Sequence, residues 1–314
     1  MYQNKRICVI LPAYNEEVTI GATLDAMPDY IDRVIVVDDG SKDGTARIAE
    51  EKGATVLRHG KNKGVGAAFN TGLRAALNVG ADITVNMDAD GQFNPADIVK
   101  LIAPMIEGKA EFVTASRFMD PSRYPVMSRV KFWGNEFMAL VISKMAGQKF
   151  YDVSCGFRAY SRNALMRLNL FGDFTYTQES FLNFAFKNVS ILEVPVEVRG
   201  RREHGRSRVA SNLFRYAYQT LKIILKTVRD YKPFRMFAIL SLFLFVIGAA
   251  SAVFLTIHYF RTGALTPHKW AGFVAGFSFL LAFLCLGFGF ILDMFARMRL
   301  NQERILFLLK RLDK

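Results

Sequence analysis

The sequence predicts an α/β protein in which a mostly parallel β-sheet covered by helices precedes a pair of transmembrane helices. Apolar runs alternate with helix-like segments over roughly the first 120 residues, and polar turns follow several of these runs. Near the C-terminus, residues 236–259 and 270–292 contain no Lys, Arg, Asp or Glu. Each segment is longer than the roughly 20 apolar residues that a helix needs to cross a bilayer.

Five apolar runs are expected to form buried strands, at residues 6–11, 33–37, 54–57, 82–87 and 111–115. Helices are expected between them, at residues 17–27, 43–52, 64–77 and 95–106. Runs as apolar as these, separated by helices, are typical of parallel strands that are covered on both faces. Because ligands bind beyond the carboxyl ends of such strands, we expect the polar turns that follow them to converge on one site.

Beyond about residue 120 the alternation lapses. Residues 128–146 are expected to form a helix whose apolar stripe either packs in the core or lies at a membrane beside an anionic group. A helix is expected from residue 177 to 187 and a strand from 189 to 198. Residues 199–208 combine five arginines with two glycines, which indicates either a loop that closes over a diphosphate or a basic patch on a lipid surface.

The turn after the fourth strand carries two carboxylates, Asp88 and Asp90, with one residue between them. Both can turn toward one point in the cleft above the sheet, and Gln92 offers a neutral oxygen on the same turn. These oxygen ligands suit a hard divalent cation that keeps positions open for a phosphate. An isolated Asp-x-Asp is also common in solvated turns, so the metal site depends on whether the rest of the chain requires one.

The glycine-rich segment at residues 64–69 resembles a dinucleotide-binding motif, but its sequence context argues against NAD or FAD binding. Phe69 stands where a third glycine is needed, and residues 61–63 rather than a strand precede the segment. The helix that begins here, with Lys63 nearby, still suits a phosphate. The three cysteines are scattered and lack the spacing of metal ligands.

The net charge of +13 is concentrated beside the two apolar segments. Residues 1–195 contain 22 basic and 22 acidic side chains, whereas residues 196–235 contain 11 and 3, and residues 297–314 contain 6 and 2. By the positive-inside tendency, both basic flanks are cytoplasmic and the short link between the spans faces outward. A basic collar at this depth attracts anionic lipid headgroups, and it argues against nucleic acid as a partner.

These observations predict four parts: an α/β domain at residues 1–208, amphipathic juxtamembrane helices at 209–235, a transmembrane pair at 236–293, and a basic cytoplasmic tail at 294–314. The chain is thus expected to be a multi-pass protein of the cell membrane with its α/β domain in the cytoplasm. The long interfacial helices permit an oligomer without requiring one.

Taken in order, the motifs resemble the inverting glycosyltransferases of family 2, which have a GT-A fold. The resemblance rests first on ILPAYNEE at residues 10–17, VDDGSKDGT at 37–45 and DADGQ at 88–92. Later motifs narrow it to polyprenyl-phosphate glycosyltransferases such as the dolichyl-phosphate mannose synthases. These are Ser116-Arg117-Phe118, Ser128-Arg129 with Asn135, residues 152–158 and residues 202–208. The likeness extends from residue 6 to about residue 230.

The resemblance implies a role for individual positions. Nucleotide-sugar binding is implied for Pro12, Tyr14, Glu16, Val37, Asp39, Asp88 and Ala89. Mg²⁺ or Mn²⁺ would be bound by Asp88, Asp90 and Gln92. The phosphates and the lipid acceptor would be met by Arg117, Arg129, Arg202, Ser207 and Arg208. Two positions depart from the family, since many relatives have Leu at the position of Gly91 and Lys at that of Arg208, but neither change removes a needed charge.

The implied reaction is transfer of a single sugar, with inversion, from GDP-mannose or a UDP-hexose to dolichyl or undecaprenyl phosphate. Asp90, Arg117 and Arg129 would act in catalysis by supporting the charge that develops on the leaving diphosphate. A phosphate monoester is mostly ionised at neutral pH, so its attack needs little help from a base. Asp152 is the candidate for positioning the acceptor or managing its proton, although an ordinary loop hydrogen bond explains it equally well.

Two alternatives stay open. Processive polysaccharide synthases share the fold and the Asp-x-Asp, but they resemble one another in a Gln-x-x-Arg-Trp motif and in having more spans. The tryptophans of this chain are Trp133 and Trp270, and neither ends such a motif. The second alternative is a catalytically silent, membrane-anchored nucleotide-sugar-binding protein. Against it, every acidic and basic position expected of the site is present.

Overall fold

The structure, a computed structural model, describes residues 1–125, 127, 129–169, 176–198, 222, 229 and 233–312. The chain divides into two compact units, Met1–Ile223 and Ile224–Lys314. The predicted arginine-rich segment at residues 199–208 lies outside the described residues. The predicted juxtamembrane helices at residues 209–235 also lie mostly outside them.

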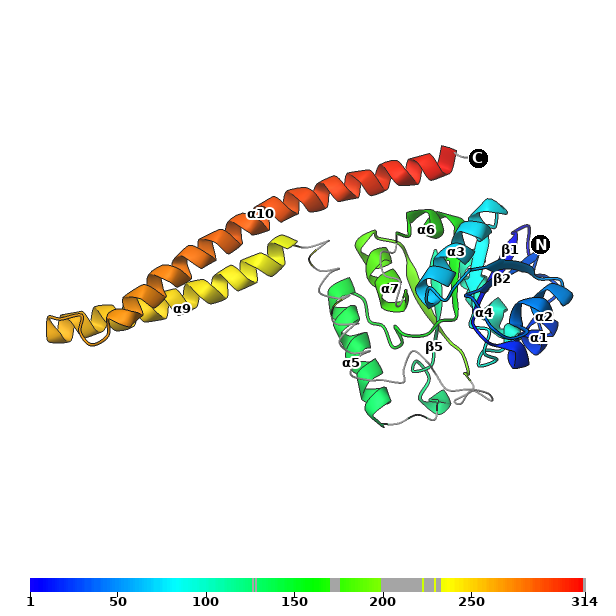
Figure 1. Ribbon diagram of the computed structural model, residues 1–314, viewed down its shortest axis with the longest axis horizontal. Coiled ribbons are helices and arrows are strands. Elements are labelled where there is room, and N and C mark those ends of the chain that lie inside the picture. Colours follow the sequence, from blue (N-terminus) through cyan, green and yellow to red (C-terminus); the bar gives the residue numbers. More distant parts are fainter. Residues whose placement is uncertain are drawn as a thin grey trace. The chain divides into compact units, whose positions relative to one another are not determined.

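The first unit is built on one seven-stranded sheet with the strand order β3-β2-β1-β4-β6-β5-β7 (Figure 1). Its strands are β1 (Ile7–Ala13), β2 (Arg33–Asp38), β3 (Thr55–Arg58), β4 (Ile83–Asn86), β5 (Phe112–Ser116), β6 (Arg158–Ser161) and β7 (Ile191–Pro195). Neighbouring strands are parallel except where β6 pairs with β4 and β5. The predicted α/β fold with a mostly parallel sheet is confirmed.

Helices cover both faces of this sheet. The helices of this unit are α1 (Glu17–Asp25), α2 (Thr45–Glu51), α3 (Val65–Asn78), η1 (Pro95–Asp97), α4 (Ile98–Ile106), η2 (Pro121–Arg123), α5 (Arg129–Ala146), α6 (Arg162–Arg167) and α7 (Thr177–Phe186). On one face α4 shares a core cluster with β5, including Leu101 and Val113. On the other, α3 approaches β1 at Gly72, where an added Cβ would lie 3.2 Å from Ile10. The strands are thus buried on both sides, as their apolar sequences require.

The second unit consists of two long helices, α9 (Pro233–Thr262) and α10 (Lys269–Leu312), which pack together. The Ser241 hydroxyl donates to the Ala282 carbonyl at 2.7 Å, and Gly248 leaves room for the ring of Phe279. Among the described residues, these two helices are long and apolar enough to cross a membrane, and they contain the predicted spans. Helix α10 continues to Leu312, so most of the predicted basic tail is helical.

Candidate active site at the carboxyl edge of the sheet

The carboxyl ends of β1, β2, β4 and β5 lie at one edge of the sheet, and the antiparallel β6 begins there. Backbone hydrogen bonds align the turns that follow. The Asp39 amide donates to the Ala13 carbonyl at 2.9 Å, and the Met87 amide donates to the Ile10 carbonyl at 3.1 Å. This topology gathers polar residues that are far apart in the sequence.

The turns after β1 and β2 are fastened to each other. The Asn15 amide donates to the Ser41 hydroxyl at 2.9 Å, and the Lys42 amide donates to the Asn15 side chain at the same distance. Asn15 has a φ of 54°, in the left-handed region that asparagine tolerates better than most residues. The predicted nucleotide-binding residues on this backbone are Pro12, Tyr14 and Glu16, all of them half-buried.

Asp39 lies just beyond β2, two positions after Val37, and both residues are buried. Its Oδ1 lies 2.7 Å from His59 Nδ1 and accepts the Lys63 amide at 3.0 Å, while its Oδ2 accepts the Gly64 amide at 2.8 Å. The Asp39 carboxylate therefore joins the end of β2 to the loop that precedes α3. Its predicted contact with a nucleoside would be made from this fixed position.

His59 belongs to the site although no sequence motif includes it. It directly follows β3, and this place after a strand is the signal that could have revealed it. Its Nε2 lies 2.9 Å from the Thr71 hydroxyl on α3. Gly40, with a φ of 77°, packs so closely on the same loop that an added Cβ would lie 2.7 Å from the Lys61 backbone. The loop after β3 thus packs beside the predicted nucleotide-binding turns.

The Asp-x-Asp turn follows β4 directly. Asp90 is buried and Asp88 is half-buried. The Gln92 amide donates to Asp90 Oδ1 at 3.1 Å, which gives the turn its shape. Thr19 on α1 donates its hydroxyl to the Ala89 carbonyl at 2.8 Å. The turn is therefore connected through α1 to the predicted nucleotide-binding residues.

Gly156, which leads into β6, makes room for the Asp88 carboxylate. A Cβ at this glycine would lie 2.9 Å from Asp88 Oδ2 and 3.1 Å from Oδ1. Asn86 Nδ2 donates to the Gly156 carbonyl and to the Tyr176 hydroxyl, both at 2.7 Å. Burial, and then the nearby charge of Asp88, raises the pKa of Tyr176 well above its ordinary value. The phenol is therefore neutral beside the carboxylate.

We expect Gly156→Ala to weaken the binding of a divalent cation about 10–100-fold, as is usual when the support of a metal ligand is disturbed. The added methyl group would collide with the Asp88 carboxylate. A Mn²⁺ titration followed by electron paramagnetic resonance measures the effect. Gly134→Ala is the matched control, since a Cβ there meets nothing within 4 Å. Equal Mn²⁺ affinity in the two variants would contradict this role of Gly156.

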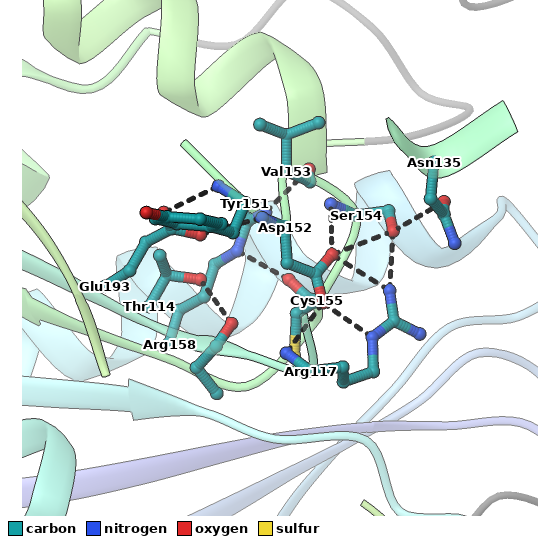
Figure 2. A network of polar contacts seen from close by, with 11 residues as sticks. Thr114, Arg117, Asn135, Tyr151, Asp152, Val153, Ser154, Cys155, Arg158 and Glu193 are labelled. Atoms are coloured by element: carbon teal, nitrogen blue, oxygen red, sulfur yellow. Dashed lines mark hydrogen bonds and ion pairs between the residues drawn. The ribbon is translucent and has the colours of Figure 1, made fainter. Parts of the chain in front are cut away.

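A second cluster at this edge is centred on Asp152, whose side chain is buried (Figure 2). Its carboxylate accepts Arg117 Nε at 2.6 Å, Arg117 Nη2 at 2.9 Å and the Arg117 amide at 3.1 Å. The Ser154 amide also donates to it at 3.1 Å, and Arg117 Nη2 donates to the Ser154 hydroxyl at 2.6 Å. These contacts fix the Arg117 guanidinium just beyond the end of β5.

The charge state of Asp152 follows from these partners. Burial alone would raise the pKa of Asp152, but the charge and hydrogen bonds of Arg117 outweigh burial and hold the pKa below its usual value. The side chain is thus a carboxylate at neutral pH, and both of its oxygens accept hydrogen bonds. Asp152 thus holds Arg117 in place, whereas its predicted roles, positioning the acceptor or managing its proton, stay predictions.

Glu193 on β7 supports the loop that carries Asp152. Its Oε2 accepts the Tyr151 amide and its Oε1 accepts the Asp152 amide, both at 2.8 Å (Figure 2). Burial raises the pKa of Glu193 to about 7, although the two amide hydrogen bonds act to lower it. No sequence motif includes Glu193, and it lies 41 residues from Asp152.

Because its pKa is raised, ionisation of Glu193 should cost stability. Between about pH 4.5 and about pH 7 the folded chain retains a proton that the unfolded chain has released. The free energy of unfolding should therefore fall as pH rises, by at most about 1.4 kcal/mol per pH unit. We expect the Tm of the wild type to fall across this window relative to that of Glu193→Gln, which cannot ionise. Parallel Tm curves, or a slope of opposite sign, would contradict the prediction.

The predicted phosphate-binding residues lie in different parts of the chain, and the structure describes only some of them. Arg117 lies in the cluster just described, whereas Arg129 begins α5 with an exposed side chain. Helix α5 does reach the cluster, because the Ser154 hydroxyl donates to Asn135 Oδ1 at 3.1 Å. The remaining predicted residues, Arg202, Ser207 and Arg208, lie outside the described residues.

The residues of the Asp-x-Asp turn fit a hard cation. Asp88, Asp90 and Gln92 supply oxygen donors from one turn, and Gly156 places no side chain against the Asp88 carboxylate. Within the described parts of the chain, no group of three or more His, Cys, Asp and Glu side chains could hold a metal ion alone. One or two carboxylates completed by substrate phosphates is a usual Mg²⁺ arrangement. The turn therefore suits a cation whose coordination a diphosphate completes.

Comparison with known proteins agrees with this geometry. The profile described as glycosyl transferase family 2 matches residues 8–168. The UDP-N-acetylglucosamine–dolichyl-phosphate N-acetylglucosaminyltransferase of Methanococcus voltae is 36% identical over 215 residues, which cover 62% of this chain and 86% of that protein. The polyprenol monophosphomannose synthase of Mycolicibacterium smegmatis is 28% identical over 235 residues, covering 68% of this chain and 84% of that protein.

Solved structures of glucosyl-3-phosphoglycerate synthase from Mycobacterium tuberculosis share the fold. One of them, in complex with Mn²⁺, UDP and glucosyl-3-phosphoglycerate, matches with a TM-score of 0.57 at 23% identity and covers 71% of this chain and 80% of that one. Another, with Mg²⁺ and UDP, has a TM-score of 0.57 at 24% identity over 71% of this chain and 79% of that one. The family match spans half of the chain, and the resemblance read from the motifs is confirmed: the chain belongs to glycosyltransferase family 2.

Proposed function

We propose that this chain transfers one sugar from a nucleotide sugar to a polyprenyl phosphate at a membrane. The proposal rests on one combination of features. The carboxyl edge of the sheet bears an Asp-x-Asp turn and an arginine fixed by a buried aspartate, in a chain that also has two helices of membrane-spanning length. The relatives from Methanococcus voltae and Mycolicibacterium smegmatis, whose names refer to dolichyl phosphate and polyprenol, support a lipid phosphate as the acceptor.

The donor would be GDP-mannose or a UDP-hexose. Its nucleoside would lie against the interlocked turns after β1 and β2, beside the loop after β3 that Asp39 holds in place. The Thr19–Ala89 hydrogen bond would hold this region in a fixed position relative to the Asp-x-Asp turn. The residues proposed to bind the donor are Pro12, Tyr14, Glu16, Val37, Asp39, Asp88 and Ala89.

Charge stabilisation on the leaving group is the main catalytic contribution that we propose. Asp88, Asp90 and Gln92 would hold Mg²⁺ or Mn²⁺, which supplies positive charge to the diphosphate of the donor. Arg117 would add a second positive group, and Asp152 keeps it in place before the donor binds. Charges that are already positioned stabilise the developing diphosphate more than they stabilise the bound donor, which lowers the barrier.

In the transfer itself, an ionised oxygen of the lipid phosphate would attack the anomeric carbon from the side opposite the diphosphate. The new C–O bond forms as the bond to the diphosphate breaks, so the configuration inverts and the nucleoside diphosphate departs with the electron pair. The attacking phosphate monoester is already largely ionised at pH 7, since its second pKa is about 6. The engaged carboxylate of Asp152 agrees with a site that needs no strong base. The acceptor phosphate would be met by Arg129, Arg202, Ser207 and Arg208.

We place the catalytic unit at the cytoplasmic side of the cell membrane, with α9 and α10 as two spans. The support is the distribution of charge: residues 196–235 contain 11 basic and 3 acidic side chains, and residues 297–314 contain 6 and 2. Basic residues beside membrane spans favour the cytoplasmic side. A polyprenyl chain leaves the bilayer only at a cost of about 0.8 kcal/mol per methylene, so an anchored enzyme meets its acceptor where that lipid resides.

A panel of radiolabelled GDP- and UDP-sugars tests the proposal, using the purified full chain in detergent with dolichyl or undecaprenyl phosphate. We expect one donor to pass its label to the organic phase, with a single sugar per lipid and only when a polyprenyl phosphate is present. A labelled polymer would instead identify a processive synthase. Donor binding without turnover across the panel would identify a silent binding protein, and either result would overturn the proposal.

A further inference from the structure

Glu193 is an acidic residue at a core-facing position of β7. Buried and partly exposed residues alternate along most of this strand, and Glu193 belongs to the buried set together with Ile191. Glu193 is 8% exposed. A carboxylate is costly to bury unless hydrogen bonds satisfy its oxygens. The partners of Glu193 therefore indicate what the residue does at this position.

Two consecutive backbone amides are these partners. Glu193 Oε2 accepts the Tyr151 amide and Oε1 accepts the Asp152 amide, each at 2.8 Å (Figure 2). Within the described part of the chain, these two amides have no other hydrogen-bond partner. Strand β7 lies at the end of the sheet and pairs with β5 alone. One carboxylate therefore joins the segment that carries Asp152 to an edge strand.

The same segment holds Arg117 through Asp152. The Asp152 carboxylate accepts Arg117 Nε at 2.6 Å, Nη2 at 2.9 Å and the backbone amide at 3.1 Å. Strand β5, which Arg117 directly follows, pairs with β7 so that Thr114 lies opposite Glu193. The contacts thus run from Glu193 through two amides to Asp152, and from its carboxylate to Arg117. A shift of the backbone at Tyr151 and Asp152 would move the guanidinium with it.

Glu193 can change its charge near neutral pH. Burial raises its pKa to about 7 against the two amide hydrogen bonds, which act to lower it, and the charge of Asp152 adds to the rise. The nearby cations have other partners, since Arg117 donates to Asp152 and Arg158 on β6 donates to the Cys155 carbonyl. Burial would also raise the pKa of Asp152, but the charge of Arg117 holds it below its usual value. Glu193 therefore titrates around neutral pH, whereas Asp152 stays ionised.

We propose that Glu193 is a positioning residue for Arg117: its negative charge holds the segment that carries Asp152, and protonation releases this segment and slows sugar transfer. A carboxylate offers an acceptor oxygen to each amide, whereas a neutral acid presents a hydroxyl, a poor acceptor, to one of them. A buried amide without a partner is unstable, so the backbone moves to find one. The displaced guanidinium then stabilises the charge on the leaving diphosphate less well. The effect on the rate rests on the proposed function, but the movement of Arg117 does not.

The pH dependence of transfer tests this role. We compare kcat of the full-length wild type and of Glu193→Gln, each with saturating donor and polyprenyl phosphate. Glutamine offers one acceptor oxygen at every pH, as the neutral acid does. The ratio of wild-type to variant kcat should rise from below about twofold at about pH 6 to about tenfold at about pH 8, following the ionisation of Glu193. Ionisation of the acceptor phosphate, whose second pKa is about 6, affects both proteins and cancels from the ratio.

Glu107→Gln is the matched control. Glu107 follows the last residue of α4, its side chain is 53% exposed, and it pairs with Lys109 at 2.6 Å. The chain then enters β5 at the amino end of that strand, so Glu107 lies at the edge of the sheet opposite to Asp152. Exposed ion pairs contribute little to stability, and the same loss of charge there should leave kcat unchanged at every pH.

Chemical modification of Arg117 tests the movement without substrates. The full-length wild type in detergent is treated with phenylglyoxal, and mass spectrometry compares the labelling of Arg117 with that of Arg74, an exposed arginine on α3. This internal reference removes the dependence of the reagent on pH. Arg117 is 20% exposed and paired with Asp152, so we expect its relative labelling to rise several-fold as the pH falls from about 8 to about 6. In Glu193→Gln it should be high at both pH values.

A kcat ratio that stays constant across this pH range, or that falls as the pH rises, would overturn the inference. If Glu193→Gln fails to fold, the wild type alone supplies the answer. Relative labelling of Arg117 that is the same at both pH values would then mean that Glu193 does not position it. Labelling that responds to pH in a protein that transfers no sugar to any polyprenyl phosphate would uphold the positioning role and refute the proposed function.

Discussion

Replacing Asp90 by asparagine should abolish sugar transfer without unfolding the catalytic unit. Asparagine has nearly the same shape, and its Oδ1 can still accept the Gln92 amide that Asp90 accepts at 3.1 Å. The change removes a negative charge that a cation needs. We expect kcat to fall by at least about 10²–10³-fold. The free energy of unfolding should change by less than about 1 kcal/mol. Extraction of labelled lipid product and thermal unfolding measure the two effects.

Asp97→Asn is the matched control for this variant. Asp97 is also buried, but it lies in η1, outside the Asp-x-Asp turn, and pairs with Lys100 at 2.7 Å. The same loss of charge there should leave transfer nearly unchanged. If Asp90→Asn retained near-normal activity with metal present, the metal site would have to be abandoned. If both variants were equally inactive, the cause would lie in folding or in overall charge.

The second large effect is expected from Asp152→Asn. In the wild type, Arg117 Nε and Nη2 donate to the two carboxylate oxygens at 2.6 and 2.9 Å. An asparagine would turn an amide donor toward one of these donors and would leave the arginine without its counter-charge. Breaking a buried ion pair costs about 3–5 kcal/mol, and the 20% exposure of Arg117 favours the lower end of that range. Displacement of Arg117 should lower kcat about 10²–10³-fold.

A double-mutant cycle distinguishes positioning from direct action. If Asp152 acts through Arg117, then Arg117→Gln, Asp152→Asn and the double variant should lose similar amounts of kcat. The coupling free energy should then exceed about 1 kcal/mol. Arg117→Lys should also lose activity, because lysine retains the charge and cannot reproduce the two-point contact. Additive losses in kcat would instead show that Asp152 acts on the acceptor or its proton independently.

The features predicted well from sequence are those encoded over short stretches of chain. Each parallel strand of the first half is a continuous apolar run, and a polar motif directly follows β1, β2, β4 and β5. Because parallel strands end at the same edge, the motifs that contain Asp39 and Asp90 were expected at one edge of the sheet, and the strand order places them there. The two membrane-length helices could also be predicted from the sequence, since length and composition define them.

The contacts that sequence reasoning missed join residues distant in the chain. The opposed direction of β6 brings Gly156 against Asp88, and no periodicity encodes that pairing. Glu193 reaches the Asp152 amide across 41 residues because β7 pairs with β5. The apolar pattern of residues 128–146 fitted core packing and a membrane surface equally well. The exposure of Phe137 decides against core packing for its face of the helix.

The rate of sugar transfer to a polyprenyl phosphate, followed while a divalent cation is removed and returned, tests the metal site most directly. If Asp88 and Asp90 hold the cation as proposed, its coordination would be completed by the diphosphate of the donor. Transfer by the full-length protein should therefore stop on addition of EDTA and recover when Mn²⁺ or Mg²⁺ is supplied in excess over the chelator. Transfer that continues undiminished in EDTA would contradict a reaction that depends on a cation held by these aspartates.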